Sequence, residues 1–200
     1  ASAKILFWIT NWQEFIQNPR QIIGSDGFVV YGGIIGGIFA GWLYCRIKKL
    51  KFLAYFDLMM PSIALAQGFG RIGCFLAGCC YGKETSGPLA VTFTSSDFAP
   101  NNIPLIPTQI YSSILDFVHF LLLLYVEKHK KADGQVAACY LIFYSIGRFI
   151  IEFFRGDIER GSVGSFSTSQ FISIFTAIAG IIVLFVATVN KKDSRNYHKK

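Results

Sequence analysis

Three charged residues lie at helical spacing inside an otherwise apolar stretch of the chain. Arg148, Glu152 and Arg155 are separated by four and three residues, so a helix would place them on one face, which Tyr144 continues. Ionisable side chains among apolar helices are costly and therefore mark functional sites. Arg148 and Glu152 can neutralise each other inside a helix bundle. Arg155 then leaves an excess positive charge, which favours an anion, and the planar guanidinium fork suits phosphate.

A fourth cationic residue lies in a glycine-rich segment that reads Gln67-Gly-Phe-Gly70-Arg71-Ile-Gly73. Three glycines in six residues allow the backbone to turn or to approach another group closely. The segment is not a dinucleotide or P-loop motif, because no strand precedes it and no Gly-Lys-Ser/Thr follows. We expect Arg71, Arg148 and Arg155 to line one phosphate pocket, for which a phospholipid head group is the most available ligand.

Cys74, Cys79 and Cys80 form a cluster within seven residues, and three chemical readings of it compete with inert packing. In the first reading, Cys79 or Cys80 is a nucleophile that carries a covalent intermediate. Alternatively, Cys74 forms a disulfide with Cys79 or Cys80, which an oxidising compartment would favour. The third reading is a zinc site, which is disfavoured because only three thiols are close and no His lies nearby. The interpretation assigns no metal ligand and no cofactor.

The elements that position these residues are predicted to be membrane helices. The chain has 200 residues, of which 52% are hydrophobic and 16% charged, and this favours one integral membrane domain over 1–200, an all-α polytopic bundle. The stretch Ile5–Trp12 is too short to cross and is expected to be the outer end of a sixth helix. The spans are predicted at Phe28–Cys45, Phe52–Gly70, Ile106–Val126, Val136–Phe154 and Phe171–Val189.

The basic residues predict the orientation of these spans. Twelve of the 19 Lys and Arg fall in the segments 46–51, 128–131 and 191–200, which five spans place on one side. Cytoplasmic loops carry such an excess, so the C-terminus is expected in the cytoplasm and the site on the other side, with the connections 71–105 and 156–170. The net charge of +7 therefore does not indicate a nucleic-acid surface. Ala1 is not followed by a signal-peptide pattern.

Small and polar residues within the spans give further candidates. Gly37 and Gly41 have the spacing of close helix packing, whereas Gly32 and Gly33 lie nearer the outer surface and are expected to line a site. Asp116 and His119 are predicted to form a buried polar pair, for which packing and catalysis are both open.

Four motifs in order resemble the prolipoprotein diacylglyceryl transferases, over nearly the whole chain. The segment from Gly70 to Gly82 (GRIGCFLAGCCYG) is similar to the family pattern G-R-x-G-N-F-x-N-x-E-x-x-G, and Tyr31-Gly32-Gly33 falls where the family has His-Gly-Gly. Pro107-Thr108-Gln109-Ile-Tyr111 is similar to P-x-Q-L-Y-E. Arg148-Phe-Ile-Ile-Glu152-Phe-Phe-Arg155 matches the R-x-x-x-E-F-F-R helix.

The resemblance implies an enzyme of the bacterial inner membrane that moves diacylglyceryl from phosphatidylglycerol to the lipobox cysteine of a prolipoprotein. Arg71 and Arg148 take the positions of its essential arginines, and Glu152 and Arg155 those of supporting ion-pair residues. The five spans correspond to the last five of seven family helices, which implies further sequence before Ala1. With the resemblance, the residues predicted to be catalytic are Arg71, Arg148, Tyr31 and Cys79. Those predicted to bind substrate are Gly32, Gly33, Gln67, Gly70, Cys74, Cys80, Gly82, Gln109, Tyr111, Glu152 and Arg155.

The departures from the family fall at positions that handle protons. The family His is Tyr31 here, its Asn is Cys74, its Glu is Cys79, and the Glu after Gln-Leu-Tyr is Ser112. A neutral Tyr is a poor base near pH 7, but a positive field from Arg71 would favour a thiolate. Two alternative functions therefore stay open: a cysteine-dependent glycerolipid transferase with another acceptor, and a non-catalytic, lipid-binding subunit of a membrane complex.

Overall fold

The computed structural model describes residues 2–19, 29–157, 162–164 and 166–197. The chain divides into two compact units, 1–52 and 53–200, and each is described here by itself. Within the described residues the structure is almost entirely helical, with two small two-stranded sheets, and this confirms the predicted all-α fold class.

The first unit contains three helices, α1 (Ser2–Thr10), α2 (Trp12–Gln17) and α4 (Val30–Ile47). The stretch predicted as the end of one helix is therefore two short helices, separated at Asn11. The helix α1 packs against α4. The unit is connected there by a hydrogen bond from the backbone N–H of Val29 to the carbonyl oxygen of Ala3, at 3.2 Å.

The contact between α1 and α4 depends on glycines other than those predicted. A Cβ atom on Gly32 would lie 2.7 Å from Leu6 Cβ, and one on Gly36 would overlap the Ser2 side chain. Within the described part of the first unit, no atom lies within 4 Å of the place of a Cβ on Gly37, so its packing role stays a prediction. A Cβ on Gly41 would make only ordinary contact, at 3.8 Å, with the Phe52 ring.

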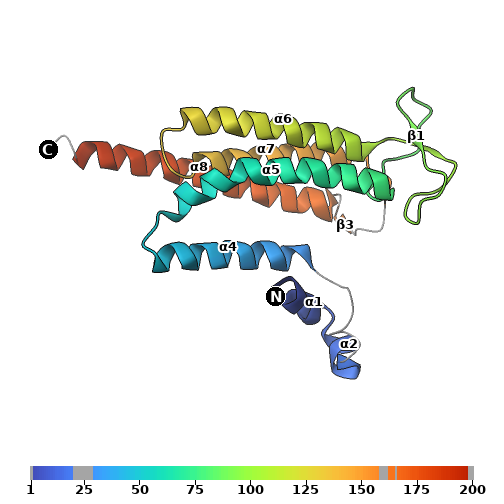
Figure 1. Ribbon diagram of the computed structural model, residues 1–200, viewed down its shortest axis with the longest axis horizontal. Coiled ribbons are helices and arrows are strands. Elements are labelled where there is room, and N and C mark those ends of the chain that lie inside the picture. The colour runs from blue at the N-terminus through green and yellow to red at the C-terminus, as the bar shows by residue number, and fades with distance from the viewer. Residues whose placement is uncertain (1, 20–28, 158–161, 165, 198–200) are drawn as a thin grey trace. The chain divides into compact units, whose positions relative to one another are not determined.

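The second unit is built on four long helices that lie side by side (Figure 1). These are α5 (Phe52–Ala77), α6 (Thr108–His129), α7 (Gln135–Glu152) and α8 (Thr168–Tyr197). The helix α7 packs against both α6 and α8. All four are long and apolar enough to cross a membrane, and a shorter apolar helix covers Gly32–Ile47 in the first unit.

The helix α5 continues seven residues beyond its predicted end. The glycines at 68, 70 and 73 are all helical, so the backbone does not turn near Arg71. The other expectation, a close approach, is confirmed at Gly68, where a Cβ would lie 2.7 Å from the Phe117 ring. The chain turns instead at Gly78, where φ is +74°, a conformation that glycine adopts without strain. Arg71 and Cys74 therefore lie one turn apart on the same helix, which fixes the spacing of their side chains.

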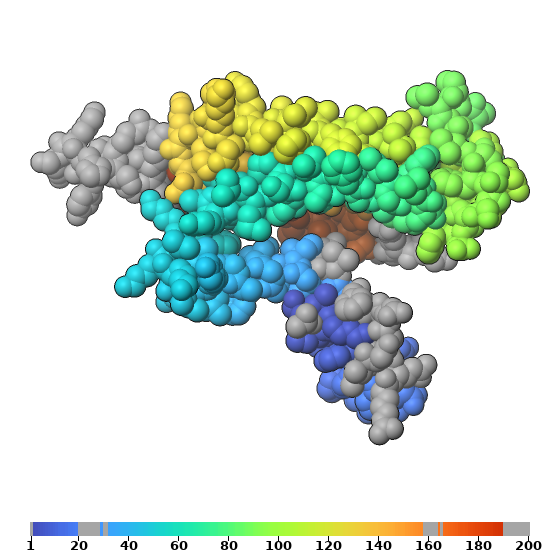
Figure 2. All heavy atoms as spheres, in the orientation of Figure 1, coloured from blue at the N-terminus to red at the C-terminus, as the bar shows by residue number. Residues whose placement is uncertain are grey.

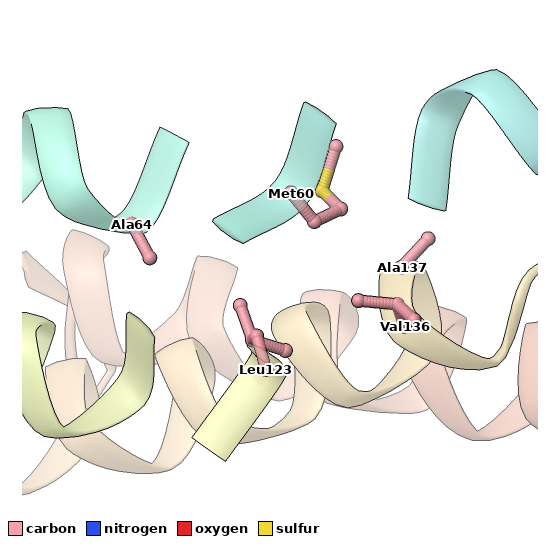
Figure 3. Close-up of a cluster of buried hydrophobic side chains, with 5 residues drawn as sticks. All are labelled: Met60, Ala64, Leu123, Val136 and Ala137. Carbon is pink, nitrogen blue, oxygen red and sulfur yellow. The ribbon is translucent and has the colours of Figure 1, made fainter. Parts of the chain in front are cut away.

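The core of the second unit joins α5, α6 and α7. Met60 and Ala64 of α5 meet Leu123 of α6 and Val136 and Ala137 of α7, and all five side chains are at most 2% exposed (Figure 3). Burial of these apolar groups stabilises the contact of the three helices.

Many large apolar side chains on the helices point outward instead. Phe185 is 69% exposed, Leu121 is 62% exposed and Ile181 is 58% exposed. A water-facing surface of this kind would be unfavourable, whereas the hydrocarbon of a bilayer solvates it. These outward-facing apolar side chains therefore fit the predicted membrane spans.

A buried carboxylate fixes the start of α7. Asp57 of α5 is fully buried and accepts hydrogen bonds from the backbone N–H groups of Gly134, at 2.8 Å, and Ala137, at 2.9 Å. The Lys130 ammonium lies 3.3 Å from the same carboxylate. Asp57, which interrupts a predicted span, thus acts as an N-terminal cap supplied by another helix.

The connections at the opposite end of the four helices carry the small sheets. The strands β1 (Val91–Thr92) and β2 (Pro104–Leu105) pair antiparallel, as do β3 (Ser162–Val163) and β4 (Phe166–Ser167). Figures 1 and 2 show the segment that carries β1 projecting beyond the ends of α5 and α6. This is the end at which the cysteine cluster lies.

Candidate active site

A cavity of about 260 Å³ lies between α6 and α7 and is closed on one side by α5. Its polar lining comes from Arg71, Ser112, Asp116, His119, Tyr144 and Arg148. The rest of the lining is apolar, and its outer residues, such as Leu122 and Ile146, are about half exposed. We call this space the arginine cavity. It joins a cationic interior to an apolar rim on the outer surface of the helices.

Arg148 is held in place by two partners. Its Nη2 atom lies 2.9 Å from Glu152 Oε2, one turn further along α7, and donates a hydrogen bond to Ser169 Oγ at 2.8 Å. The Arg148 and Glu152 side chains are only 12% and 8% exposed. The predicted pair is therefore formed and buried, and it orients the guanidinium toward the arginine cavity.

The predicted source of the excess positive charge is wrong. Arg155 does not stay uncompensated, because Asp157 binds its guanidinium with both carboxylate oxygens, including a bond from Arg155 Nε to Asp157 Oδ1 at 2.8 Å. Although burial alone would lower the pKa of Arg155, its hydrogen bonds with Asp157 and Cys80 raise that pKa above the ordinary arginine value. Arg155 is thus charged, is paired with Asp157, and links α7 to the cysteine loop.

Arg71 supplies the excess charge instead. Among the described residues, no carboxylate lies within ion-pair distance of its guanidinium, and Asp116 acts on it only through the longer-range attraction between the two charges. The charges of Arg71 and Arg155 both act on Arg148. Since Glu152 pairs with Arg148, Arg71 is the cation of the cavity that has no ion-pair partner among the described residues, and an incoming phosphate can take that place.

The cysteine cluster lies beside this charge. The Sγ atoms of Cys74, Cys79 and Cys80 are within 4.8 Å of one another, and all three thiols are half-buried and free of disulfides. Burial, the hydrogen bond with Cys74 and the nearby Cys80 together raise the pKa of the Cys79 thiol to about 12, and burial has the largest effect. A thiol with this pKa is protonated near pH 7, which disfavours the reading of Cys79 as a free nucleophile.

The cysteine loop is clamped from α6. Gln109 Nε2 donates to the carbonyl oxygen of Cys79 at 2.8 Å, and Thr108 Oγ1 donates to that of Cys80 at 2.9 Å. Cys80 itself has a φ of +60°, which few residues other than glycine adopt. Gln109, predicted to bind substrate, therefore has a visible role in holding the cysteine backbone, and its Oε1 atom is buried with no hydrogen-bond partner among the described residues.

Close backbone packing explains another predicted site residue. Gly82 donates its N–H to the carbonyl oxygen of Ile106 at 3.0 Å, and a Cβ at Gly82 would lie 2.5 Å from that oxygen. A Cβ on Gly156 would overlap the Gly82 carbonyl. Gly82 thus lets the loop that follows the cysteines pack against the end of α7, and a contact with substrate stays a prediction.

The other predicted residues are placed as follows. Gln67 on α5 accepts a hydrogen bond from the Tyr140 hydroxyl at 2.9 Å. Gly70 is exposed on the same helix and has no described atom within 4 Å of the place of its Cβ. Tyr111 is half-buried on α6. Within the described part of the chain, no hydrogen bond joins Asp116 to His119, and the His119 ring stacks on Tyr140 with centroids 5.2 Å apart.

The first unit carries the remaining predicted residues. Gly32 is buried against α1 and Gly33 is exposed. Tyr31 belongs to α4, but its side chain lies outside the described residues. A role for these three in catalysis or binding therefore stays a prediction.

Sequence reasoning missed three residues that position the site. Ser169 and Asp157 bind the two arginines of α7, and Thr108 holds the cysteine loop. Asp157 follows Arg155 by two residues and Thr108 lies in a quoted motif, so both carried a signal. Ser169 carried none, because its pairing with Arg148 depends on how α8 packs against α7.

Comparison with known proteins shows the family of the chain. The family model for prolipoprotein diacylglyceryl transferase matches residues 2–186. The chain belongs to the prolipoprotein diacylglyceryl transferase family. It is 52% identical over 190 residues to the phosphatidylglycerol–prolipoprotein diacylglyceryl transferase of Clostridium tetani, covering 94% of this chain and 76% of that protein.

Further relatives agree. The second such transferase of Clostridium perfringens is 50% identical over 195 residues, with 96% of this chain and 74% of that protein covered. The transferase of Clostridioides difficile is 37% identical over 194 residues, with 96% and 75% covered. Family membership makes the chain a transferase of the membrane, and the arginine cavity is its candidate site.

Proposed function

We propose that this chain transfers the diacylglyceryl group of phosphatidylglycerol to the cysteine thiol of a prolipoprotein, and that the transfer takes place at the arginine cavity. Relatives named for this activity are up to 52% identical to the chain. The single observation that carries the assignment to this cavity is Arg71, a cation without an ion-pair partner among the described residues, facing the buried Arg148–Glu152 pair.

The chemistry explains why two arginines are needed. The acceptor sulfur attacks the glyceryl carbon that bears the phosphate, a C–S bond forms, and the C–O bond breaks. Its electron pair stays on the phosphate oxygen, so a singly charged diester becomes a doubly charged glycerol phosphate, while the thiol proton leaves to a base or to solvent. Arg71 and Arg148 are placed to stabilise the charge that develops on the leaving oxygen.

The shape of the cavity supports a lipid donor. The polar groups lie inside, whereas Leu122, Ile146 and Ile150 at the rim are 45%, 51% and 50% exposed. A phosphatidylglycerol molecule can therefore place its head group among the arginines while its acyl chains stay against apolar side chains. Glu152 and Ser169 hold the Arg148 guanidinium in one orientation, which reduces the reorganisation needed when the charge develops.

The orientation of the protein is part of the proposal. The start of α5, the loop 128–131 and the C-terminal end of α8 lie at one end of the second unit, where the basic residues gather in the sequence (Figure 1). We assign that end and the C-terminus to the cytoplasm. The cysteine loop and the arginine cavity then face the non-cytoplasmic side, where a prolipoprotein would present its lipobox.

The test uses purified full-length protein in phosphatidylglycerol vesicles with a lipobox peptide, followed by mass spectrometry of the peptide. We expect lipopeptide from the wild type and little from Arg148→Gln, with Lys83→Gln as a control that removes an exposed cation. Bound phospholipid, stable partner proteins and no turnover would instead indicate the non-catalytic subunit. A diacylglyceryl adduct on the protein's own cysteine, formed without peptide, would indicate the cysteine-dependent reaction with another acceptor.

A further inference from the structure

The three thiols of the cysteine loop are close enough to share one ion. A zinc-like ion with Zn–S bonds of about 2.3 Å and tetrahedral angles separates its sulfur ligands by roughly 3.8 Å. The Sγ atoms of Cys74, Cys79 and Cys80 already lie within 4.8 Å of one another. The remaining difference of about 1 Å is within the reach of side-chain rotation.

The loop around these thiols is built to hold them in position. Cys74 is fixed by the last turns of α5, and Cys79 donates its N–H to the Cys74 carbonyl oxygen at 3.1 Å. The carbonyl groups of Cys79 and Cys80 are bound by Gln109 and Thr108, both at most 1% exposed. Metal sites depend on such supporting hydrogen bonds, because these orient the ligands.

The charge around the cluster also suits a metal thiolate. A divalent ion with three thiolates carries one negative charge, and Arg155 hydrogen-bonds to the Cys80 side chain. Its guanidinium would offset that charge. Within the described part of the chain, the cluster has no fourth His, Cys, Asp or Glu ligand. Sites with three protein ligands and one open position are catalytic rather than structural.

We propose that Cys74, Cys79 and Cys80 bind a thiophilic divalent cation of the zinc class, and that its open position takes the acceptor thiol as a thiolate. The second half of the proposal rests on the proposed function. Coordination releases the thiol proton to solvent, and the sulfur then attacks the glyceryl carbon as the C–O bond to phosphate breaks. The chain has Tyr31, Cys79 and Ser112 where the family motifs have a His and two Glu, and a bound cation would favour the thiolate beyond the field of Arg71.

The location of the cluster fits that step. Cys74 follows Arg71 by one helical turn, and Arg155 joins Cys80 to the helix that carries Arg148. A sulfur held at the cluster would therefore lie beside the cations that bind the phosphate of the donor. The nucleophile and the leaving group would be positioned by neighbouring turns of the same two helices.

The binding test uses full-length protein, purified in detergent under reducing conditions and without lipid or peptide. We expect about one zinc per chain by elemental analysis, and a thiolate-to-cobalt charge-transfer band in the near ultraviolet when Co(II) is added. Cys74→Ser, Cys79→Ser and Cys80→Ser should each lose the band. Cys139→Ser, a free cysteine on α7 outside the cluster, is the matched control and should keep it.

A second variant keeps the three ligands. Gln109→Leu removes a supporting hydrogen bond, and we expect zinc affinity to fall ~10–100-fold, with unchanged stoichiometry at saturation. Absence of stoichiometric binding, equal loss in Cys139→Ser, or a Cys74 disulfide with Cys79 or Cys80 in protein alkylated without reductant would overturn the site. Because binding is measured without substrates, zinc binding without transfer would contradict only the proposed function. Full transfer by metal-free protein would contradict the thiolate step.

Discussion

Replacing Arg71 by Gln removes the cation that the structure leaves without an ion-pair partner among its described residues. Arg148 is paired with Glu152 at 2.9 Å and Arg155 with Asp157, so Arg71 is the cation left to pair with a phosphate in the arginine cavity. Loss of one preorganised donor to a developing oxyanion costs about 10²–10³-fold in kcat, or ~2.7–4 kcal/mol. We expect a loss of that size for Arg71→Gln, and a smaller one for Arg71→Lys, which keeps the charge but not the fork.

The assay measures initial rates of lipopeptide formation at varied mole fractions of phosphatidylglycerol in neutral carrier vesicles. Because the second negative charge on phosphate develops during the reaction, kcat should fall and not KM alone. Lys83→Gln, which removes an exposed cation from the loop at the same end of the helices, should leave both constants unchanged. Rates for Arg71→Gln within about threefold of wild type, or an equal loss for Lys83→Gln, would refute the charge argument.

Three further predictions concern stability. Asp57→Ala leaves two backbone N–H groups without their acceptor and removes one of the two carboxylates that pair with Lys130, so it should cost ~1–3 kcal/mol for each N–H and lower the melting temperature in detergent. The exposed Asp97→Ala should not, and equal melting of the two variants would contradict this. Burial alone would lower the pKa of Lys130, but its hydrogen-bonded carboxylate partners raise that pKa. The stabilisation by Lys130 is therefore full at neutral pH and is lost as the pH rises above about 10.4. Lys130→Met should lose less stability than wild type when melting is measured at alkaline pH, and parallel curves of melting temperature against pH would contradict this. Gly156→Ala should lower the melting temperature, because the added Cβ would overlap the backbone carbonyl of Gly82. Gly70→Ala should keep or raise the melting temperature, because Gly70 lies in a helix with open space around the place of its Cβ. The reverse order would show that the loop packs differently.

The membrane helices could be predicted because they depend on local composition. Long apolar runs specify α6, α7 and α8 to within a few residues at most boundaries, since each run must satisfy its own backbone hydrogen bonds. The end of α5 could not be placed in this way. Its glycines permit a turn, and only the contacts of the following loop show that the helix continues to Ala77.

The arginine face was predictable and its charge balance was not. The spacing of Arg148, Glu152 and Arg155 predicts a shared face and a buried pair, and the pair is confirmed. Which arginine keeps an uncompensated charge depends on Asp157 beyond the end of α7 and on α5, which brings Arg71 to the cavity. Periodicity within one helix carries no information on either.

The central claim is tested most directly by the stoichiometry of the reaction. Full-length protein is incubated with phosphatidylglycerol vesicles and a lipobox peptide, and released glycerol phosphate and lipopeptide are both quantified. We predict that the two products form one for one, and that a peptide with Ser in place of the lipobox Cys yields neither. Release of glycerol phosphate without lipopeptide would contradict transfer to a prolipoprotein thiol. The absence of both products, with protein that is folded and has bound lipid, would contradict it as well.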